Sequence, residues 1–277
     1  MDTLVTTAWL AQNLGQPDLA IVDCSAFMPN DGRDGASEFH EAHIPGARFL
    51  DINAVADRTS PVPHMLPSAD EFGRAMTGLG VGHDDRIMVY DNSPLRTAAR
   101  GWFMFRHFGA ERVAILDGGF QKWRSEGRPV EAGDARPRVT RFDAHARDGE
   151  VVTKAQILAG IGLPILDARG KARFEGSEAD PRPNVGAGHI PGSKNLAFAA
   201  LYRQDGTLRS DRELQAAFDH LRVDPAAAFI ASCGSGVTAN SLIFAAHRLG
   251  GRQGKLYDGS WSEWGADPST PKEMGPA

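Results

Sequence analysis

The sequence predicts an α/β protein made of two tandem domains, each a mainly parallel sheet flanked by helices. Three observations support this prediction. The chain has 277 residues, more than one domain usually holds and suited to two domains of about 100 to 150 residues each. Its two halves repeat one another. Within each half, short apolar runs alternate with patterns of helical spacing, which is typical of a parallel sheet covered by helices.

The repeat is clearest in the tetrapeptide His43-Ile44-Pro45-Gly46, which returns 146 residues later at positions 189–192. Neighbouring segments return in the same order, so the similarity is unlikely to be chance. Residues 4–7 parallel 151–153, residues 20–23 parallel 164–167, residues 66–68 parallel 208–210, and residues 116–118 parallel 257–259. Self-similarity over such a distance indicates a duplicated unit.

The repeat predicts where the domains begin and end. The first domain is expected over residues 1–125 and the second over residues 150–277. The stretch between them, 126–149, is rich in Gly, Pro, Arg and Asp and lacks a sustained apolar period. It is therefore predicted to be a linker.

Secondary structure is predicted most clearly in the second half. Residues 164–166 and 228–232 are short apolar runs, as expected of buried strands, whereas residues 211–221 and 238–249 have helical spacing. Ser68 and Ser210 are each followed three residues later by Glu. This spacing predicts a capping box at the start of two helices.

Composition favours a folded protein that acts on small molecules. The chain is 42% hydrophobic and 23% charged, and its net charge of −5 provides no broad basic surface for nucleic acid or an anionic membrane. Residues 1–19 lack a signal-like pattern and no run approaches the roughly 18 apolar residues of a membrane span, so we expect a cytoplasmic protein. Only two cysteines occur and no CxxC pair suggests zinc, so no metal site is expected. No cofactor is expected either.

The first difference between the halves is the loop after a predicted strand. The first half continues into Asp91-Asn92-Ser93-Pro94, and the second into Cys233-Gly234-Ser235-Gly236-Val237-Thr238. A cysteine at the carboxyl end of a parallel strand lies where ligands bind in open α/β sheets. Gly234 and Gly236 allow the backbone to turn its N–H groups inward, and a following helix favours an anion, so a thiolate is expected at Cys233.

Each cysteine also has a structural interpretation. A buried apolar residue is the commonest fate of a cysteine, and for Cys233 this alternative is set against its glycine loop. Cys24 lies within the apolar run 21–24 and is predicted to belong to the core.

The second difference is an insertion before the second His-Ile-Pro-Gly turn. Arg173 stands where the first half has Glu38, and about eleven additional residues, among them Arg182, follow before His189. Arginine binds a carboxylate or sulfonate through paired hydrogen bonds, so Arg173 and Arg182 are candidates for binding an anionic substrate. The alternative for each is a solvated surface charge.

The third difference is the proline-rich segment 59–67, which contains His64. A rigid loop can position this histidine to carry a proton, although a lone histidine is more often a structural hydrogen-bonding group. His43 and His189 occur in both halves, so a shared turn explains them better than catalysis does.

With these features the chain resembles the tandem rhodanese-domain sulfurtransferases over almost its whole length. Segment 233–238 matches the CG[ST]GVT loop of the subgroup that uses 3-mercaptopyruvate, whereas thiosulfate-specific relatives usually carry CRKGVT. The two His-Ile-Pro-Gly turns, the Asp-Arg-Thr-Ser-Pro and His-Met-Leu-Pro elements and the paired Asp-Gly and Trp elements add to the resemblance.

The resemblance implies a role for each candidate. Cys233 is the nucleophile and persulfide carrier, Arg173 and Arg182 bind the carboxylate and ketone of the donor, and Ser235 with His64 moves a proton. The loop residues Gly234, Gly236, Val237 and Thr238 are expected to bind the substrate. The acidic residue often proposed to orient the histidine is Asn53 here, which supplies no negative charge. A small thiol, cyanide or a thioredoxin-like protein is the implied acceptor.

Three alternatives remain at this stage. One is a thiosulfate sulfurtransferase, although Gly234 and Ser235 bring no positive charge for a dianionic donor. Another is a CX5R phosphatase, but Ala239 stands where the phosphate-binding arginine is needed. The third is a non-catalytic tandem binding module, which the intact Cys233 loop disfavours.

Overall fold

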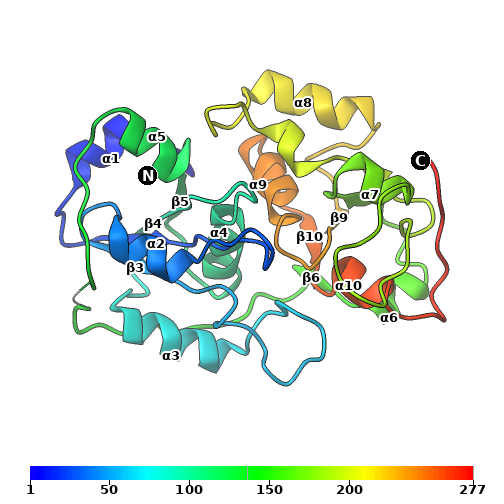
Figure 1. Cartoon of the computed structure of the whole chain (residues 1–277), viewed down its shortest axis with the longest axis horizontal. Helices are drawn as coiled ribbons and strands as arrows, with labels where there is room; N and C mark the ends of the chain where they lie inside the picture. The colour runs from blue at the N-terminus through cyan, green and yellow to red at the C-terminus, as the bar shows by residue number, and fades with distance from the viewer. Residues whose placement is uncertain (136, 277) are drawn as a thin grey trace. The chain divides into compact units, whose positions relative to one another are not determined.

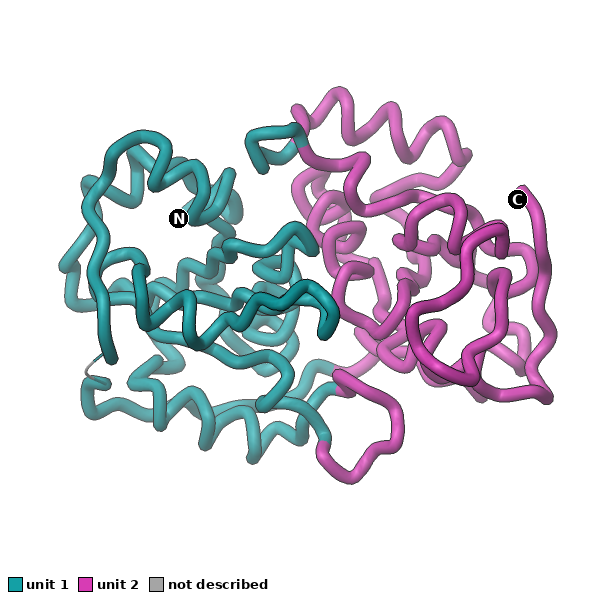
Figure 2. The backbone as a smooth tube through the Cα atoms, viewed as in Figure 1, with its two compact units in different colours: residues 1–57, 66–147, 203–208 teal, residues 58–65, 148–202, 209–277 magenta. Residues whose placement is uncertain are grey.

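The structure, a computed structural model, describes residues 1–135 and 137–276 and divides the chain into two compact units (Figure 2). Unit 1 comprises residues 1–57, 66–147 and 203–208. Unit 2 comprises residues 58–65, 148–202 and the chain from Arg209 onward. Each unit therefore includes a short segment from the other half of the sequence.

Unit 1 is built on a five-stranded parallel sheet with the strand order β1-β5-β4-β2-β3, of which Figure 1 labels β3, β4 and β5. The strands are β1 (Leu4–Val5), β2 (Leu19–Asp23), β3 (Ala47–Phe49), β4 (Arg86–Tyr90) and β5 (Val113–Leu116). The helices are α1 (Thr7–Asn13), α2 (Gly35–Glu41), α3 (Ala69–Leu79), α4 (Ala98–His107) and α5 (Gly119–Ser125).

Unit 2 repeats this plan with the strand order β6-β10-β9-β7-β8, again parallel throughout. The strands are β6 (Val151–Val152), β7 (Ile165–Asp167), β8 (Lys194–Asn195), β9 (Phe229–Ser232) and β10 (Gly254–Tyr257). The helices are α6 (Lys154–Leu158), α7 (Lys171–Glu175), the 3-10 helix η1 (Phe198–Leu201), α8 (Asp211–His220), α9 (Asn240–Arg248) and α10 (Ser260–Trp264). The matching strand orders confirm the duplication and the predicted fold class.

Both faces of each sheet are buried, as the near-continuous apolar strands require. In unit 1, Ile21 and Met88 belong to one core cluster with Leu10 of α1 and Trp123 of α5. Side chains alternate along a strand, so Val89 points to the opposite face, which α4 covers. In unit 2 the corresponding cluster includes residues of β9, β10, α6 and α10.

The predicted helix starts are confirmed at two places. The Ser68 and Ser210 side chains each accept the backbone N–H of a Glu three residues later, and both capping boxes are complete. Helix α9 begins at Asn240, two residues later than the pattern suggested. The buried Asn240 amide instead donates to the carbonyls of Gly236 (2.7 Å) and Val237 (2.9 Å), which holds the preceding residues in a loop.

The units differ from the contiguous ranges expected from the sequence. Residues 58–65 belong to unit 2, and residues 203–208 belong to unit 1, where the Leu208 N–H donates to Asp117. Most of the expected linker also belongs to unit 1. Phe142 is buried against Phe72, and Glu131 forms a β-bridge with His43. Isolated contacts of this kind, made by one residue at a time, produce no periodic apolar pattern in the sequence, so the sequence does not predict them.

The two His-Ile-Pro-Gly turns are scaffold, as predicted. The His43 ring is buried, stacks on Phe39 at 4.0 Å and hydrogen-bonds its carbonyl through Nδ1. His189 makes the same two contacts with Phe174.

Within the described residues, no helix is both long and apolar enough to cross a membrane.

Candidate active site

Cys233 lies at the carboxyl edge of the unit 2 sheet, directly after β9. Strand β9 pairs with β7 in the middle of the sheet. The strand that follows β7 in the chain, β8, lies beyond β7, whereas the strand that follows β9, β10, lies on the other side of β9, so the strand order reverses between β7 and β9. Ligands bind at this point of reversal in open parallel sheets, because two loops diverge there and leave a crevice. Cys233 is 1% exposed, so the groups packed around it determine the chemistry of its thiol.

The loop after Cys233 is shaped by its two glycines. Gly236 has a φ of +73°, which side chains other than glycine rarely adopt, and a Cβ there would collide with the Asp258 carbonyl oxygen. The carbonyl groups of Val237 and Thr238 accept the N–H groups of Asn240 and Ser241, so these two residues form the turn into α9. The predicted loop residues thus connect Cys233 to the start of α9 through a tight turn.

Several backbone donors of this loop remain available. Within the described chain, the N–H groups of Ser235, Val237 and Thr238 donate no hydrogen bond. Unpaired N–H groups ahead of a helix attract an anion.

The matching loop of unit 1 supports this interpretation, because Asp91 follows β4 as Cys233 follows β9. Its carboxyl oxygens accept the N–H groups of Ser93 (2.9 Å) and Ala98 (2.7 Å). Unit 1 therefore fills its loop with its own carboxyl group, and burial raises the pKa of Asp91.

Ser260 is a residue that the sequence analysis missed. Its hydroxyl accepts the Cys233 N–H at 3.0 Å, lies 2.8 Å from the Tyr257 carbonyl oxygen, to which it donates, and stands 3.9 Å from Cys233 Sγ. Ser260 has a φ of +48°, and Gly119 occupies the same place in unit 1 with a φ of +59°. A serine in a glycine position is strained, which is typical of functional sites. The signal in the sequence was the difference at this repeat position, where one half has Gly119 and the other has Ser260.

Arg173 and Arg182 meet beside the loop of Cys233. A Cβ built on Gly234 would lie 2.8 Å from Nη2 of Arg182 and 3.3 Å from Nη2 of Arg173. Only a glycine leaves room for both guanidinium groups at this distance. The sequence analysis missed their shared partner, Asp180, whose carboxylate binds Arg173 at 2.7 Å and Arg182 at 2.9 Å. The insertion itself pointed to Asp180, which lies two residues before Arg182.

Unit 1 has no equivalent anion site among its described residues. Glu38, at the place of Arg173, forms an ion pair with Arg33 and accepts the Asn92 side-chain amide at 2.8 Å. Asn92 itself stands where unit 2 has Gly234. Unit 1 therefore has a carboxylate, already paired with Arg33, and an amide at the sequence positions where unit 2 has Arg173 and Gly234.

His64 and Ser235 are also brought together. Segment 58–65 belongs to unit 2, and His64 Nδ1 lies 2.9 Å from Ser235 Oγ. His64 has a φ of +62°, a strained conformation for this residue. The Asn53 side chain is exposed and makes no hydrogen bond within the described chain, so its suggested role in orienting the ring stays a prediction.

Cys24 is a core residue, as predicted. It is fully buried, its Sγ lies against Gly101 of α4, and burial raises the pKa of its thiol well above the usual value. Ala168 occupies the same place in unit 2: the N–H of Cys24 donates to Tyr90 as that of Ala168 donates to Ser232. The position serves packing in both units.

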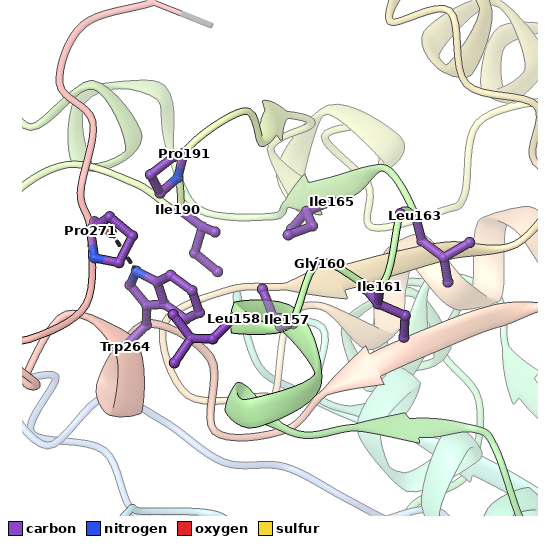
Figure 3. A pocket seen from close by; sticks show the side chains of 11 residues that line it. Ile157, Leu158, Gly160, Ile161, Leu163, Ile165, Ile190, Pro191, Trp264 and Pro271 are labelled. Carbon is purple, nitrogen blue, oxygen red and sulfur yellow. Dashed lines mark hydrogen bonds between the residues drawn. The ribbon is translucent and has the colours of Figure 1, made fainter.

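Unit 2 also contains an apolar pocket of about 260 Å³ (Figure 3). Ile157, Ile165, Ile190 and Trp264 line it. Ile165 begins β7, whereas Cys233 follows the end of the parallel strand β9, so the pocket lies at the opposite edge of the sheet from the thiol. No group of three or more His, Cys, Asp or Glu side chains within the described ranges is arranged to hold a metal ion.

Comparison with known proteins connects this geometry to a family. The model of the rhodanese-like domain matches the chain twice, over residues 6–126 and 151–267. The chain belongs to the tandem rhodanese family of sulfurtransferases. This sulfurtransferase is 40% identical over 269 residues to 3-mercaptopyruvate sulfurtransferase of Escherichia coli K12, covering 96% of this chain and 95% of that protein.

Two further relatives bear on the donor and the fold. The rat thiosulfate sulfurtransferase is 38% identical over 271 residues, covering 94% of this sulfurtransferase and 91% of the rat protein. The crystal structure of SseA from Escherichia coli superposes with a TM-score of 0.86 at 38% identity, covering 95% of this chain and all of SseA. The enzymatic relatives set aside the non-catalytic alternative.

Proposed function

We propose that this sulfurtransferase moves sulfur from 3-mercaptopyruvate to a thiol-type acceptor through a persulfide on Cys233. The observation that carries the proposal is the arrangement around Gly234, where the loop of Cys233 and the guanidinium groups of Arg173 and Arg182 adjoin. The arginines suit the carboxylate and ketone of an α-keto acid. The similarity to the Escherichia coli enzyme supports the same donor.

In the first half-reaction the Cys233 thiolate attacks the donor sulfur and breaks its bond to carbon. The electron pair of that bond leaves with pyruvate enolate, which takes up a proton at carbon. The donor thiol loses its proton as the sulfur joins Cys233, so the reaction yields pyruvate and an anionic persulfide without an oxidant. Ser235 and His64, hydrogen-bonded at 2.9 Å, are the groups that carry this proton. The N–H groups of the loop stabilise the terminal sulfur anion.

In the second half-reaction an acceptor thiolate, a cyanide ion or a thioredoxin-like protein attacks the terminal sulfur and restores the Cys233 thiolate. Thiosulfate is the alternative donor, which the similarity to the rat thiosulfate sulfurtransferase favours. Gly234 and Ser235 add no positive charge for that dianion, so mercaptopyruvate is expected to be preferred. A cytoplasmic location remains a prediction from the sequence.

The test is release of pyruvate from mercaptopyruvate with and without an added thiol, beside the rate with thiosulfate. Cys233→Ser should abolish transfer with either donor, and intact-mass analysis should place one additional sulfur on Cys233 of the wild-type protein. Cys24→Ala is the matched control, because unit 2 has alanine at that position, and it should remain active. Persulfide on Cys24 alone, or a faster reaction with thiosulfate, would overturn the assignment.

A further inference from the structure

Asp180 is the most buried member of the charged group beside the loop. Its side chain is 1% exposed, whereas those of Arg173 and Arg182 are 21% and 23% exposed. One carboxylate oxygen accepts Nη2 of Arg173 at 2.7 Å. The other accepts both the N–H and Nη1 of Arg182, at 3.0 and 2.9 Å. A buried carboxylate with these charge-assisted hydrogen bonds fixes the rotation of both guanidinium groups.

The two guanidinium groups retain donors for a ligand. Arg173 Nε is buried and has no hydrogen-bond partner in the described part of the protein. A buried N–H without a partner is costly, which indicates that a ligand atom completes it. Arg182 uses Nη1 for Asp180 and directs Nη2 toward Gly234. Asp180 therefore binds Arg182 through Nη1 and leaves its Nη2 facing Gly234, whereas Nη2 of Arg173 both binds Asp180 and lies beside Gly234, so that Nε is the unused buried donor of Arg173.

Asp180 also sets the charge of this group. Two guanidinium groups alone carry +2, and one carboxylate shared between them reduces the total to +1. We propose that Asp180 is a positioning and specificity-determining residue, which orients Arg173 and Arg182 and matches their charge to a donor with one carboxylate. The inference rests on the proposed function, since it concerns the choice between the two donors of that site.

The physical reason is the different charge of the two donors. A monoanion is held well by a site of charge +1 whose donors are fixed in direction, because each hydrogen bond is directional. A dianion depends more on total charge, and a buried carboxylate a few ångströms from its site repels it at low effective dielectric. Removing the carboxylate should therefore weaken binding of mercaptopyruvate and favour thiosulfate.

The experiment measures kcat and KM for both donors in Asp180→Asn. Asparagine keeps one acceptor oxygen but points an N–H group at one arginine, so orientation is lost and the charge rises to +2. We expect kcat/KM for mercaptopyruvate to fall at least about tenfold, chiefly through KM, while that for thiosulfate is maintained or rises. The ratio of the two should move at least about tenfold toward thiosulfate.

Two other variants serve as controls. Glu178→Gln removes an equal charge from the same insertion at an exposed position that makes no hydrogen bond or ion pair with either arginine in the described part of the chain, and it should leave the ratio unchanged. Asp180→Glu keeps the charge and should keep the ratio within about threefold, even if both rates fall. Asp180→Ser, smaller and neutral, repeats the ratio test if the asparagine variant does not fold.

The outcomes separate this inference from the proposed function. A wild-type protein that releases no pyruvate from mercaptopyruvate refutes the function itself. If the wild type is active, an equal fall for both donors in Asp180→Asn shows a merely structural role and overturns the inference. An unchanged ratio, or an equal shift in Glu178→Gln, overturns it as well.

Discussion

Gly234 and Gly236 lie two residues apart in the loop of Cys233, yet alanine at each should produce a different defect. At Gly236 alanine would have to adopt a φ of +73°, which costs about 1 to 2 kcal/mol. Its Cβ would also collide with the Asp258 backbone, and overpacking of this kind costs about 1 to 3 kcal/mol. The free energy of unfolding should therefore fall by about 2 to 5 kcal/mol.

At Gly234 the backbone is not left-handed, so the fold should tolerate alanine with a stability change below about 1 kcal/mol. The new Cβ would displace the tip of Arg182, 2.8 Å away. Loss of one charge-assisted hydrogen bond to the donor costs about 1.5 to 3 kcal/mol, so kcat/KM should fall by about 10- to 100-fold.

Urea denaturation followed by circular dichroism, together with steady-state pyruvate release, distinguishes the two defects. With a slope of about 2 kcal/mol per molar urea, Gly236→Ala should lower the denaturation midpoint by about 1 to 2.5 M. Gly234→Ala should keep the wild-type midpoint. A normal midpoint for Gly236→Ala, or a normal rate for Gly234→Ala, would refute the reasoning.

Two further predictions concern proton transfer and pH. Ser235→Ala and His64→Ala should each lower kcat, and the double variant should be little worse than either, because the two act as one hydrogen-bonded pair; fully additive losses would separate their roles. Burial raises the pKa of Asp23 to about 7, so the folded state retains a proton that the unfolded chain loses above about pH 4. This stabilisation is complete below about pH 4 and disappears as pH rises through about 7. Asp23→Asn should weaken the pH dependence of the denaturation midpoint over that window. A midpoint that changes with pH as steeply as in the wild type would count against the assignment.

Much of the fold was predictable because its signals are local or repeated. The capping boxes at Ser68 and Ser210 depend on residues three positions apart, and the apolar strand runs depend on burial of a continuous segment. The repeat then made differences between the halves informative. Cys233 opposite Asp91, and Arg173 opposite Glu38, stood out because one copy serves as a reference for the other.

The insufficient signals were those that depend on contacts between distant segments. Nothing in the sequence near position 142 predicts that Phe142 packs on Phe72, one of the contacts that join most of segment 126–149 to unit 1. The assignment of residues 58–65 to unit 2 likewise depends on contacts far along the chain, among them the one between His64 and Ser235, which are 171 residues apart.

The sequence alone determined the duplicated α/β plan and predicted a nucleophile and two substrate-binding arginines, because residue type and repeat position suffice to single out these candidates. Only the tertiary structure decided how these groups are held. Asp180 and Ser260 are unremarkable in the sequence, and their roles arise from burial and from hydrogen bonds of 2.7 to 3.0 Å to groups that folding brings together. Residue types determine which chemistry is possible, whereas the folded site determines how the functional groups are oriented and what net charge they carry together.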